Sequence, residues 1–207
     1  MNRILFVLAL VVLAACGAPT AQSQPAAKAA PPQGAVQEAV FAGGCFWCTE
    51  HDFKAIPGVT EVLSGYTGGH LANPSYQDVI TETTGHYESV RVRFDSGRIT
   101  YRQLVDRYWR LIDPTDDDGQ FCDRGPSYRS AIFAMPAQRA DAEASKAALV
   151  ASHRLNGQVV TQVLPLGPFY PAEQYHRDYA KKNALHYNAY RTGCGRDAKL
   201  AVVWRNN

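Results

Sequence analysis

Five cysteines are the residues of this 207-residue chain most able to do chemistry. Cys16 ends an apolar N-terminal run, whereas Cys45, Cys48, Cys122 and Cys194 lie where the sequence shows regular patterning. Thiols act as nucleophiles and form sulfenic acids or disulfides, and they also ligate metals or staple secreted domains. The surroundings of the four later cysteines must distinguish these uses.

Cys45 has the setting of a nucleophile. Gly43 and Gly44 precede it, and residues 45–56 form a helical segment without a breaker before Pro57. A thiol at a helix N-terminus faces unpaired amides and the positive end of the helix dipole, which favours the thiolate. We therefore expect an activated Cys45, with the two glycines allowing close approach of a substrate.

The other three thiols leave several interpretations open. Cys48, Cys122 or Cys194 could resolve an oxidised Cys45 as a disulfide, and all four cysteines could equally be static staples of a secreted domain. Cys45 and Cys48 also have the spacing of a zinc-ligand pair. Because Cys122 and Cys194 supply no second pair, a metal site is not expected.

Glu88 is the candidate acid. Residues 86–95 alternate strictly, with Val90, Val92 and Phe94 on one face, and Glu88 shares that apolar face. Burial raises the pKa of a carboxyl group and keeps it a proton donor near neutral pH. The alternative is a solvated carboxylate at a strand end.

The elements that must position these groups interleave without a uniform βα rhythm. Strands are expected at residues 35–41, 59–66, 86–95, 128–134 and 159–164, and helices at 45–56, 100–112, 136–154 and 172–190. This order predicts an α+β fold. We expect a two-layer α/β sandwich around a mixed sheet, a ferredoxin-like plait, with a long coil-rich C-terminal tail.

The N-terminus resembles an export signal. Arg3 is followed by an apolar run through residue 15, too short to span a membrane and suited to a signal peptide over residues 1–15. The run ends Leu13-Ala14-Ala15-Cys16, which resembles a bacterial lipobox; an ordinary cleavage site is the alternative. We therefore expect export to the periplasmic side of a bacterial membrane, with membrane contact only through a lipid on Cys16.

Composition separates the rest of the chain into two parts. Residues 16–35 are rich in alanine and proline and predict a disordered tether, so residues 36–207 form the catalytic domain. The chain has 21 basic and 19 acidic residues and no long basic run, which excludes a nucleic-acid partner. Composition does not indicate the oligomeric state, and a monomer is the simplest expectation.

Six motifs in order along residues 36–207 resemble those of the A-type peptide methionine sulfoxide reductases. They are Gly43-Gly44-Cys45-Phe46-Trp47, Gly65-Tyr66-Thr67-Gly68-Gly69, Pro74-Ser75-Tyr76, Thr84-Gly85-His86-Tyr87-Glu88, Asp123-Arg124-Gly125-Pro126-Ser127-Tyr128-Arg129-Ser130 and Tyr175-His176. The resemblance implies reduction of the S epimer of methionine sulfoxide, free or within proteins, without a cofactor. Cys45 would attack the sulfoxide sulfur and become a sulfenic acid, which a second thiol converts to a disulfide for a thioredoxin-like donor to reduce.

The same resemblance assigns the other site residues. Glu88 would protonate the sulfoxide oxygen and Tyr76 and Tyr128 would hydrogen-bond it, while Asp123 lies near the reactive thiol. Phe46 and Trp47 match the pocket for the substrate methyl group. His176 lies in a motif, but a lone histidine on a helix is usually packed or hydrogen-bonded, so no catalytic role is assigned to it.

Recycling is the step that the resemblance leaves open. Family members commonly place the resolving thiol in a C-terminal tail, which favours Cys194. Cys48 is disfavoured as the direct partner, because Phe46 and Trp47 between the two cysteines must hold the substrate pocket, and a relay through Cys48 or Cys122 is the alternative. A rival interpretation is a thioredoxin-like thiol-disulfide oxidoreductase that uses Cys45 and Cys48. That interpretation leaves Glu88 and the two tyrosines without a task.

Overall fold

The computed structural model describes residues 34–205. The expected signal peptide, Cys16 and nearly all of the expected tether lie outside the described residues. The Gly34 amide donates a 2.6 Å hydrogen bond to Asp95, and the Ala35 carbonyl accepts from Ser96. Within residues 34–205, no helix is both long and apolar enough to cross a bilayer.

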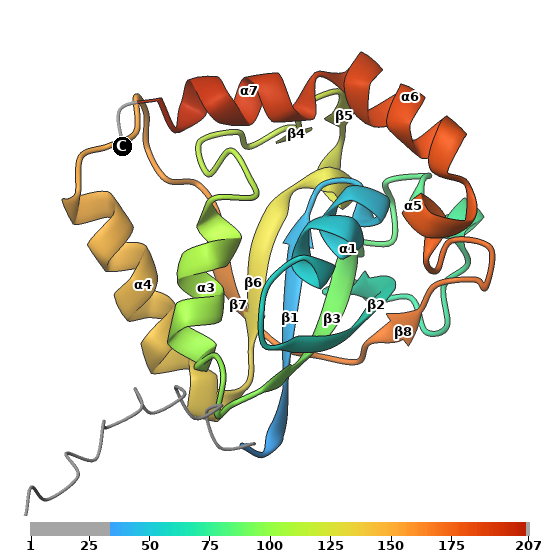
Figure 1. Ribbon diagram of the computed structural model, residues 1–207. Helices are drawn as coiled ribbons and strands as arrows, with labels where there is room; N and C mark the ends of the chain where they lie inside the picture. The colour runs from blue at the N-terminus through green and yellow to red at the C-terminus, as the bar shows by residue number, and fades with distance from the viewer. Residues whose placement is uncertain (1–33, 206–207) are drawn as a thin grey trace, which may run out of the picture. The chain divides into compact units, whose positions relative to one another are not determined.

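A six-stranded mixed sheet forms the centre of the described part (Figure 1). Its strand order is β7-β6-β1-β3-β2-β8, and all neighbours pair antiparallel except β6 and β7. The strands are β1 (Val36–Gly43), β2 (Val59–Thr67), β3 (Tyr87–Asp95), β6 (Ser130–Ala134), β7 (Gln162–Pro165) and β8 (Tyr170–Pro171). A separate hairpin pairs β4 (Gly119–Gln120) with β5 (Asp123–Arg124). The predicted α+β class with a mixed sheet is confirmed.

Helices cover one face of this sheet. Phe41 of β1 stacks on Phe53 and Tyr108, with ring centroids 4.9 Å apart in both pairs. These rings belong to α1 (Phe46–Lys54) and α3 (Tyr101–Trp109), so both helices lie over the same strand. Buried aromatic side chains of this kind contribute much of the stability of a protein core.

The opposite face is covered by chain without helical structure. Val40, Ala42 and Phe133 point to that side and pack against Leu166 and Phe169, which lie between β7 and β8.

The face predicted to be apolar in residues 86–95 is buried. Glu88 and the three apolar residues of its face are all buried in β3.

Residues 34–205 contain five further helices and two 3-10 turns. They are α2 (Tyr76–Val79), α4 (Arg139–Ala151), α5 (Tyr179–Lys182), α6 (Ala184–Cys194) and α7 (Arg196–Val203), with single 3-10 turns η1 (Pro126–Tyr128) and η2 (Pro136–Gln138). Thr100 and Gln103 form the capping box that begins α3.

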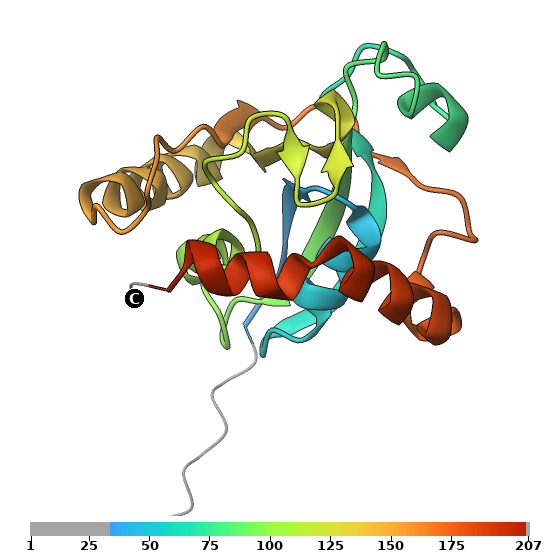
Figure 2. The same ribbon diagram turned by 90° about the horizontal axis from the view of Figure 1, so that it is seen from above.

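The expectation of a coil-rich C-terminal tail is wrong. Helices α6 and α7 follow each other along one side of the domain, drawn red in Figures 1 and 2. Gly195, with φ of 67°, turns the chain between them, so this glycine separates two helices and does not begin a coil. The single helix expected over residues 172–190 is also wrong, because residues 172–173 have no regular structure and residues 174–178 are turns that end at a left-handed Asp178.

Candidate active site

A glycine turn after β1 places Cys45 at the N-cap of α1. Gly44 has φ of 76°, and a Cβ there would lie 2.5 Å from Cβ of Gln120, so only glycine fits both the conformation and the space. The Cys45 carbonyl accepts hydrogen bonds from Thr49 and starts the helix. Cys45 is 6% exposed, so the residue is buried.

Glu88 reaches the same helix end from β3. Its Oε2 accepts a 2.9 Å hydrogen bond from the Phe46 amide, and the residue is 2% exposed. Burial raises the pKa of Glu88 to about 8, against the opposing effect of the Phe46 amide. The carboxyl group is therefore largely protonated at neutral pH, as its position on the apolar face predicts.

The two free thiols of α1 are hydrogen-bonded to each other. Burial raises the pKa of Cys45, and the hydrogen bond to Cys48 and the charge of Glu88 add to this effect. The pKa of Cys48 is lowered by the hydrogen bond from Cys45, against burial, and by the charges of Arg196 and Arg191. Cys48 is therefore the more readily ionised of the two thiols, and burial opposes the thiolate that was expected at Cys45.

Tyr76 and Tyr128 come from distant parts of the chain to one position. Their hydroxyls hydrogen-bond to each other beside Glu88, and burial followed by the Glu88 charge raises the pKa of both. Glu173 orients this corner, because its carboxylate accepts the Tyr76 amide at 2.7 Å and the Tyr66 hydroxyl at 2.9 Å. The sequence gives no signal for Glu173, which lies in the segment expected to be helical.

Aromatic rings form the wall beside Cys45. Trp47 stacks face to face on Tyr179 with centroids 3.8 Å apart, and Phe46 lies 5.0 Å from the His176 ring. Trp47 Nε1 donates a 3.0 Å hydrogen bond to Nδ1 of His176, which is 3% exposed. His176 is thus packed and hydrogen-bonded, as expected, and its ring also lies 4.5 Å from that of Tyr76.

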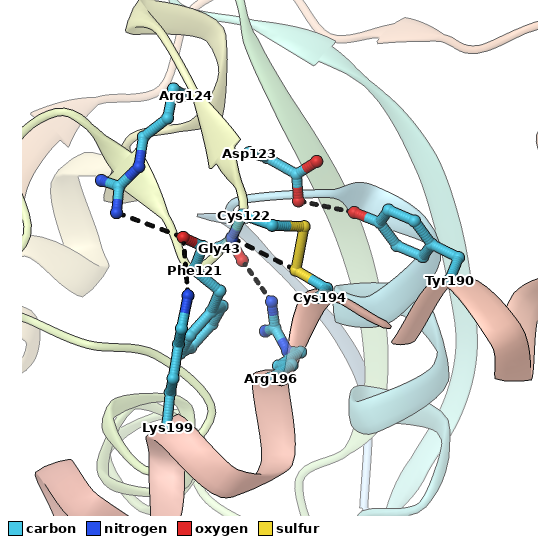
Figure 3. The surroundings of a disulfide bond; sticks show 9 residues. All are labelled: Gly43, Phe121, Cys122, Asp123, Arg124, Tyr190, Cys194, Arg196 and Lys199. Carbon is cyan, nitrogen blue, oxygen red and sulfur yellow. Dashed lines mark hydrogen bonds between the residues drawn. A yellow bond between two sulfur atoms is a disulfide. The ribbon is translucent and has the colours of Figure 1, made fainter. Parts of the chain in front are cut away.

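A disulfide joins Cys122 to Cys194 (Figure 3). It links the segment between β4 and β5 to the end of α6, across 72 residues of sequence. The Tyr190 hydroxyl hydrogen-bonds Asp123 at 2.5 Å and also the Cys45 sulfur. Asp123 therefore lies near the reactive thiol, as expected, through a tyrosine that sequence reasoning missed.

The same corner contains the cluster with metal-ligand spacing in the described residues. It consists of Cys122, Asp123 and Cys194, whose ligand atoms lie within 4.8 Å of one another. Because its two sulfurs are bonded to each other, neither is a thiolate that could bind a metal.

Arg196, the first residue of α7, ties the C-terminal helices to the turn before Cys45. Its buried guanidinium donates to the Gly43 carbonyl at 3.3 Å and to the Leu111 carbonyl at 2.7 Å. Asp52 of α1 faces Arg196 at 3.4 Å and binds Arg191 at 2.8 Å. Sequence reasoning missed both arginines, because they lie in or beside the expected coil.

Comparisons with known proteins identify the family of the chain. The family model described as Peptide methionine sulfoxide reductase matches residues 37–207. A Caulobacter vibrioides protein named Peptide methionine sulfoxide reductase MsrA 2 is 59% identical over 202 residues, which are 97% of this chain and 96% of the relative. The Bacillus pumilus protein named Peptide methionine sulfoxide reductase MsrA is 50% identical over 80% of this chain and 94% of its own length.

Two solved structures are also similar. Mxr1 from Saccharomyces cerevisiae in reduced form gives a TM-score of 0.67 at 30% identity, covering 72% of this chain and 86% of its own. Methionine sulfoxide reductase A of Corynebacterium diphtheriae gives 0.64 at 34% identity, covering 72% and 76%. On the family match and these identities, the chain belongs to the peptide methionine sulfoxide reductase family.

Proposed function

We propose that this protein reduces the S epimer of methionine sulfoxide, free or within proteins, to methionine. One observation carries the proposal: a nucleophile and a protonated acid meet at one helix end, since Glu88 accepts the amide of the residue after Cys45. The names of the relatives describe reduction of peptide methionine sulfoxide.

In the first step the Cys45 sulfur attacks the sulfoxide sulfur. Its proton passes to Cys48, the thiol to which it is hydrogen-bonded and the lower in pKa of the two. Glu88 delivers a proton to the sulfoxide oxygen, which makes attack on sulfur favourable. The products are methionine and a sulfenic acid on Cys45, so one oxygen atom moves from substrate to enzyme.

Substrate orientation follows from the groups around Cys45. The hydroxyls of Tyr76 and Tyr128 lie beside Glu88 and are placed to donate to the same oxygen. Phe46 and Trp47 form the apolar wall that takes the methyl group.

Recycling proceeds through a relay of disulfides. The Cys48 thiol condenses with the Cys45 sulfenic acid, which releases water and forms the first disulfide. The reduced Cys194 and Cys122 then take over the oxidation by thiol-disulfide exchange, which ends in the Cys122–Cys194 disulfide of this structure. Cys194 therefore acts second, because Cys48 is the thiol next to Cys45, and a thioredoxin-like donor completes the cycle.

The test of the activity separates the two sulfoxide epimers. Purified protein with dithiothreitol is given a racemic methionine sulfoxide peptide, and the epimers are followed by chromatography. Loss of the S epimer alone, abolished in Cys45→Ser, supports the proposal, and persistence of both epimers contradicts it. The rival thioredoxin-like function predicts instead rapid reduction of insulin disulfides that requires both Cys45 and Cys48.

We also propose export and anchoring from the sequence of the first 35 residues. The apolar run over residues 1–15 and the Leu13-Ala14-Ala15-Cys16 sequence support a signal peptide and a lipid on Cys16, with residues 16–35 as a tether to a periplasmic, monomeric catalytic domain. Labelling of cells with radioactive palmitate tests this. Label in the wild type that is absent in Cys16→Ala supports the anchor, and an unlabelled wild type contradicts it.

We infer further that the core is a ferredoxin-like plait. The strand order β6-β1-β3-β2, with α1 after β1 and α3 after β3, supports this inference. Strands β7 and β8 then extend the plait at its two edges.

A further inference from the structure

We propose that Cys122 supplies the sulfur at which the external reductant attacks, and that Cys194 is the inward sulfur that exchanges with Cys45 and Cys48. This inference rests on the proposed function and assigns the two halves of one disulfide to different partners. The four cysteines differ in their exposure to solvent. Cys45, Cys48 and Cys194 are 6%, 2% and 8% exposed, whereas Cys122 is exposed.

Access decides which sulfur of a disulfide another protein can attack. Exchange requires the incoming thiolate to reach the sulfur directly, so a buried sulfur reacts only with a thiol inside the same domain. Cys122 lies in the turn between β4 and β5, and Cys194 ends α6 beneath it (Figure 3). The reductant therefore meets Cys122 first.

Hydrogen bonding makes Cys194 the better leaving group. The Cys122 amide donates to the Cys194 sulfur at 3.2 Å, and that bond strengthens when the sulfur becomes a thiolate. Leaving groups that hold negative charge more easily depart faster. Attack at Cys122 is therefore favoured because its sulfur is exposed and because Cys194 is the better leaving group.

The charged groups around the disulfide do not distinguish its two sulfurs. The Arg196 guanidinium lies over the Phe121 ring at 4.6 Å, and Lys199 donates to the Phe121 carbonyl at 3.0 Å. The Asp123 carboxylate is the opposing charge, within 4.8 Å of both sulfurs, and the Tyr190 hydroxyl hydrogen-bonds it. Because Asp123 faces both sulfurs, its charge does not distinguish them.

The exchange is balanced in atoms and electrons. A thiolate of a thioredoxin-like dithiol attacks the Cys122 sulfur, the Cys122–Cys194 bond breaks, and its electron pair leaves on Cys194. The second thiol of the reductant then attacks the mixed disulfide and releases the Cys122 thiolate. Both enzyme thiolates take protons from water, and the reductant leaves as a disulfide.

Cys194 is left inside the domain after this exchange. It lies on α6, the helix whose Tyr187 packs against Cys45 and Cys48 in one buried cluster. The inward sulfur thus stays with the pair that it must oxidise or reduce, and the outward sulfur stays with the solvent.

Trapping of the mixed disulfide tests the assignment. Full-length protein, oxidised with diamide, reacts with a thioredoxin whose second active-site cysteine is replaced by serine. The mixture is quenched in acid, alkylated and mapped without reduction. We expect the trap on Cys122 in roughly tenfold excess, with Cys194 alkylated. A trap on Cys194, Cys45 or Cys48 would overturn the proposal.

The design separates this inference from the proposed function. Diamide forms the disulfide without any sulfoxide, so the mapping does not require Cys45 to reduce a substrate. Single-turnover reduction of a methionine sulfoxide peptide by the wild-type protein is measured separately. Failure of that turnover would contradict the proposed function, whereas the mapping alone decides the role of Cys122.

Discussion

Burial affects the protonation of both Glu88 and Cys45. The same loss of water raises the pKa of both groups, which keeps a proton on the carboxyl group and also on the thiol. A protonated acid is useful for the sulfoxide oxygen, whereas a protonated nucleophile is not. Cys48 resolves this conflict, because it accepts the hydrogen of Cys45 and lies under the charges of Arg196 and Arg191.

The acid role of Glu88 predicts a pH-dependent first step. Because the pKa of Glu88 is about 8, its proton is present below that pH and lost above it. In Glu88→Gln we expect single-turnover reduction at neutral pH to fall by roughly 100-fold, the lower range for a general acid, and the decline above about pH 8 to disappear. Rapid quench with methionine detection measures both. A Glu88→Gln rate equal to the wild type at neutral pH would contradict the acid role.

The same group predicts a pH-dependent stability. Its pKa is raised on folding, so between the unfolded value near 4.5 and about 8 the folded state binds more protons, and stability falls as pH rises through that window. Between about pH 5 and about pH 8 this group should cost about 3 kcal/mol in wild type. Urea unfolding at both pH values measures the loss. Glu88→Gln is the control, and an equal pH dependence in both proteins would refute the assignment.

The alternation of apolar and polar residues predicts the burial of Glu88, but it does not predict which residues from distant parts of the chain complete the site. Alternation over residues 86–95 is a local property, and it places Glu88 on the buried face without knowledge of any partner. Glu173 contacts Tyr76 across 97 residues, and Arg196 contacts Gly43 across 153. No local pattern encodes contacts at such separations, so these residues emerge only from the fold.

At the scale of elements, the non-helical segment over residues 172–178 is the main correction. A helix was expected there, yet Glu173 and His176 contact the site from chain without helical structure. Left-handed Asp178 and Gly195 set where the following helices begin and end. Asp178 gives no clear signal in the sequence, whereas Gly195 indicates a break without showing that helix continues on both sides.

Glu173 should hold the oxygen-binding corner through Tyr66 and the Tyr76 amide. Removing a charged acceptor of two hydrogen bonds in Glu173→Ala should lower the free energy of unfolding by roughly 2 to 3 kcal/mol, measured in urea. Tyr66→Phe, which removes one of those bonds, is the matched control and should lose roughly half as much. Equal stability of Glu173→Ala and wild type would contradict this position for Glu173.

The relay predicts different trapped species in two serine variants. After one equivalent of sulfoxide, Cys194→Ser should accumulate a Cys45–Cys48 disulfide, because the exposed Cys122 cannot reach the buried pair. Cys122→Ser should instead accumulate a disulfide between Cys194 and Cys45 or Cys48. Peptide mapping without reduction distinguishes them, and the same disulfide in both variants would exclude the relay order.

At the scale of the whole molecule, the C-terminal helices close the site onto the sheet. The Cys122–Cys194 disulfide, the Arg196 hydrogen bonds and the Arg191–Asp52 ion pair all join α6 and α7 to elements far earlier in the chain. The catalytic site is therefore assembled from both ends of the described domain. In the proposed relay, the disulfide among these three links breaks and forms again in every cycle.

The oxidised domain should be measurably more stable than the reduced one. A disulfide that closes 72 residues lowers the entropy of the unfolded chain by an amount worth about 4 kcal/mol at room temperature. Urea unfolding of oxidised protein, of dithiothreitol-reduced protein and of Cys122→Ser compares the states. Reduced wild type and Cys122→Ser should agree, and no difference between oxidised and reduced protein would refute the contribution.

The most direct measurement concerns a variant in which Cys48, Cys122 and Cys194 are all serine. One equivalent of a methionine S-sulfoxide peptide is added without reductant, and methionine and protein mass are followed together. The account predicts one methionine per enzyme, formed more slowly than in the wild type because Cys48 no longer accepts the Cys45 proton, and one added oxygen on Cys45, which dimedone captures as a sulfenic acid. No methionine, or a dimedone adduct at any other residue, would contradict it.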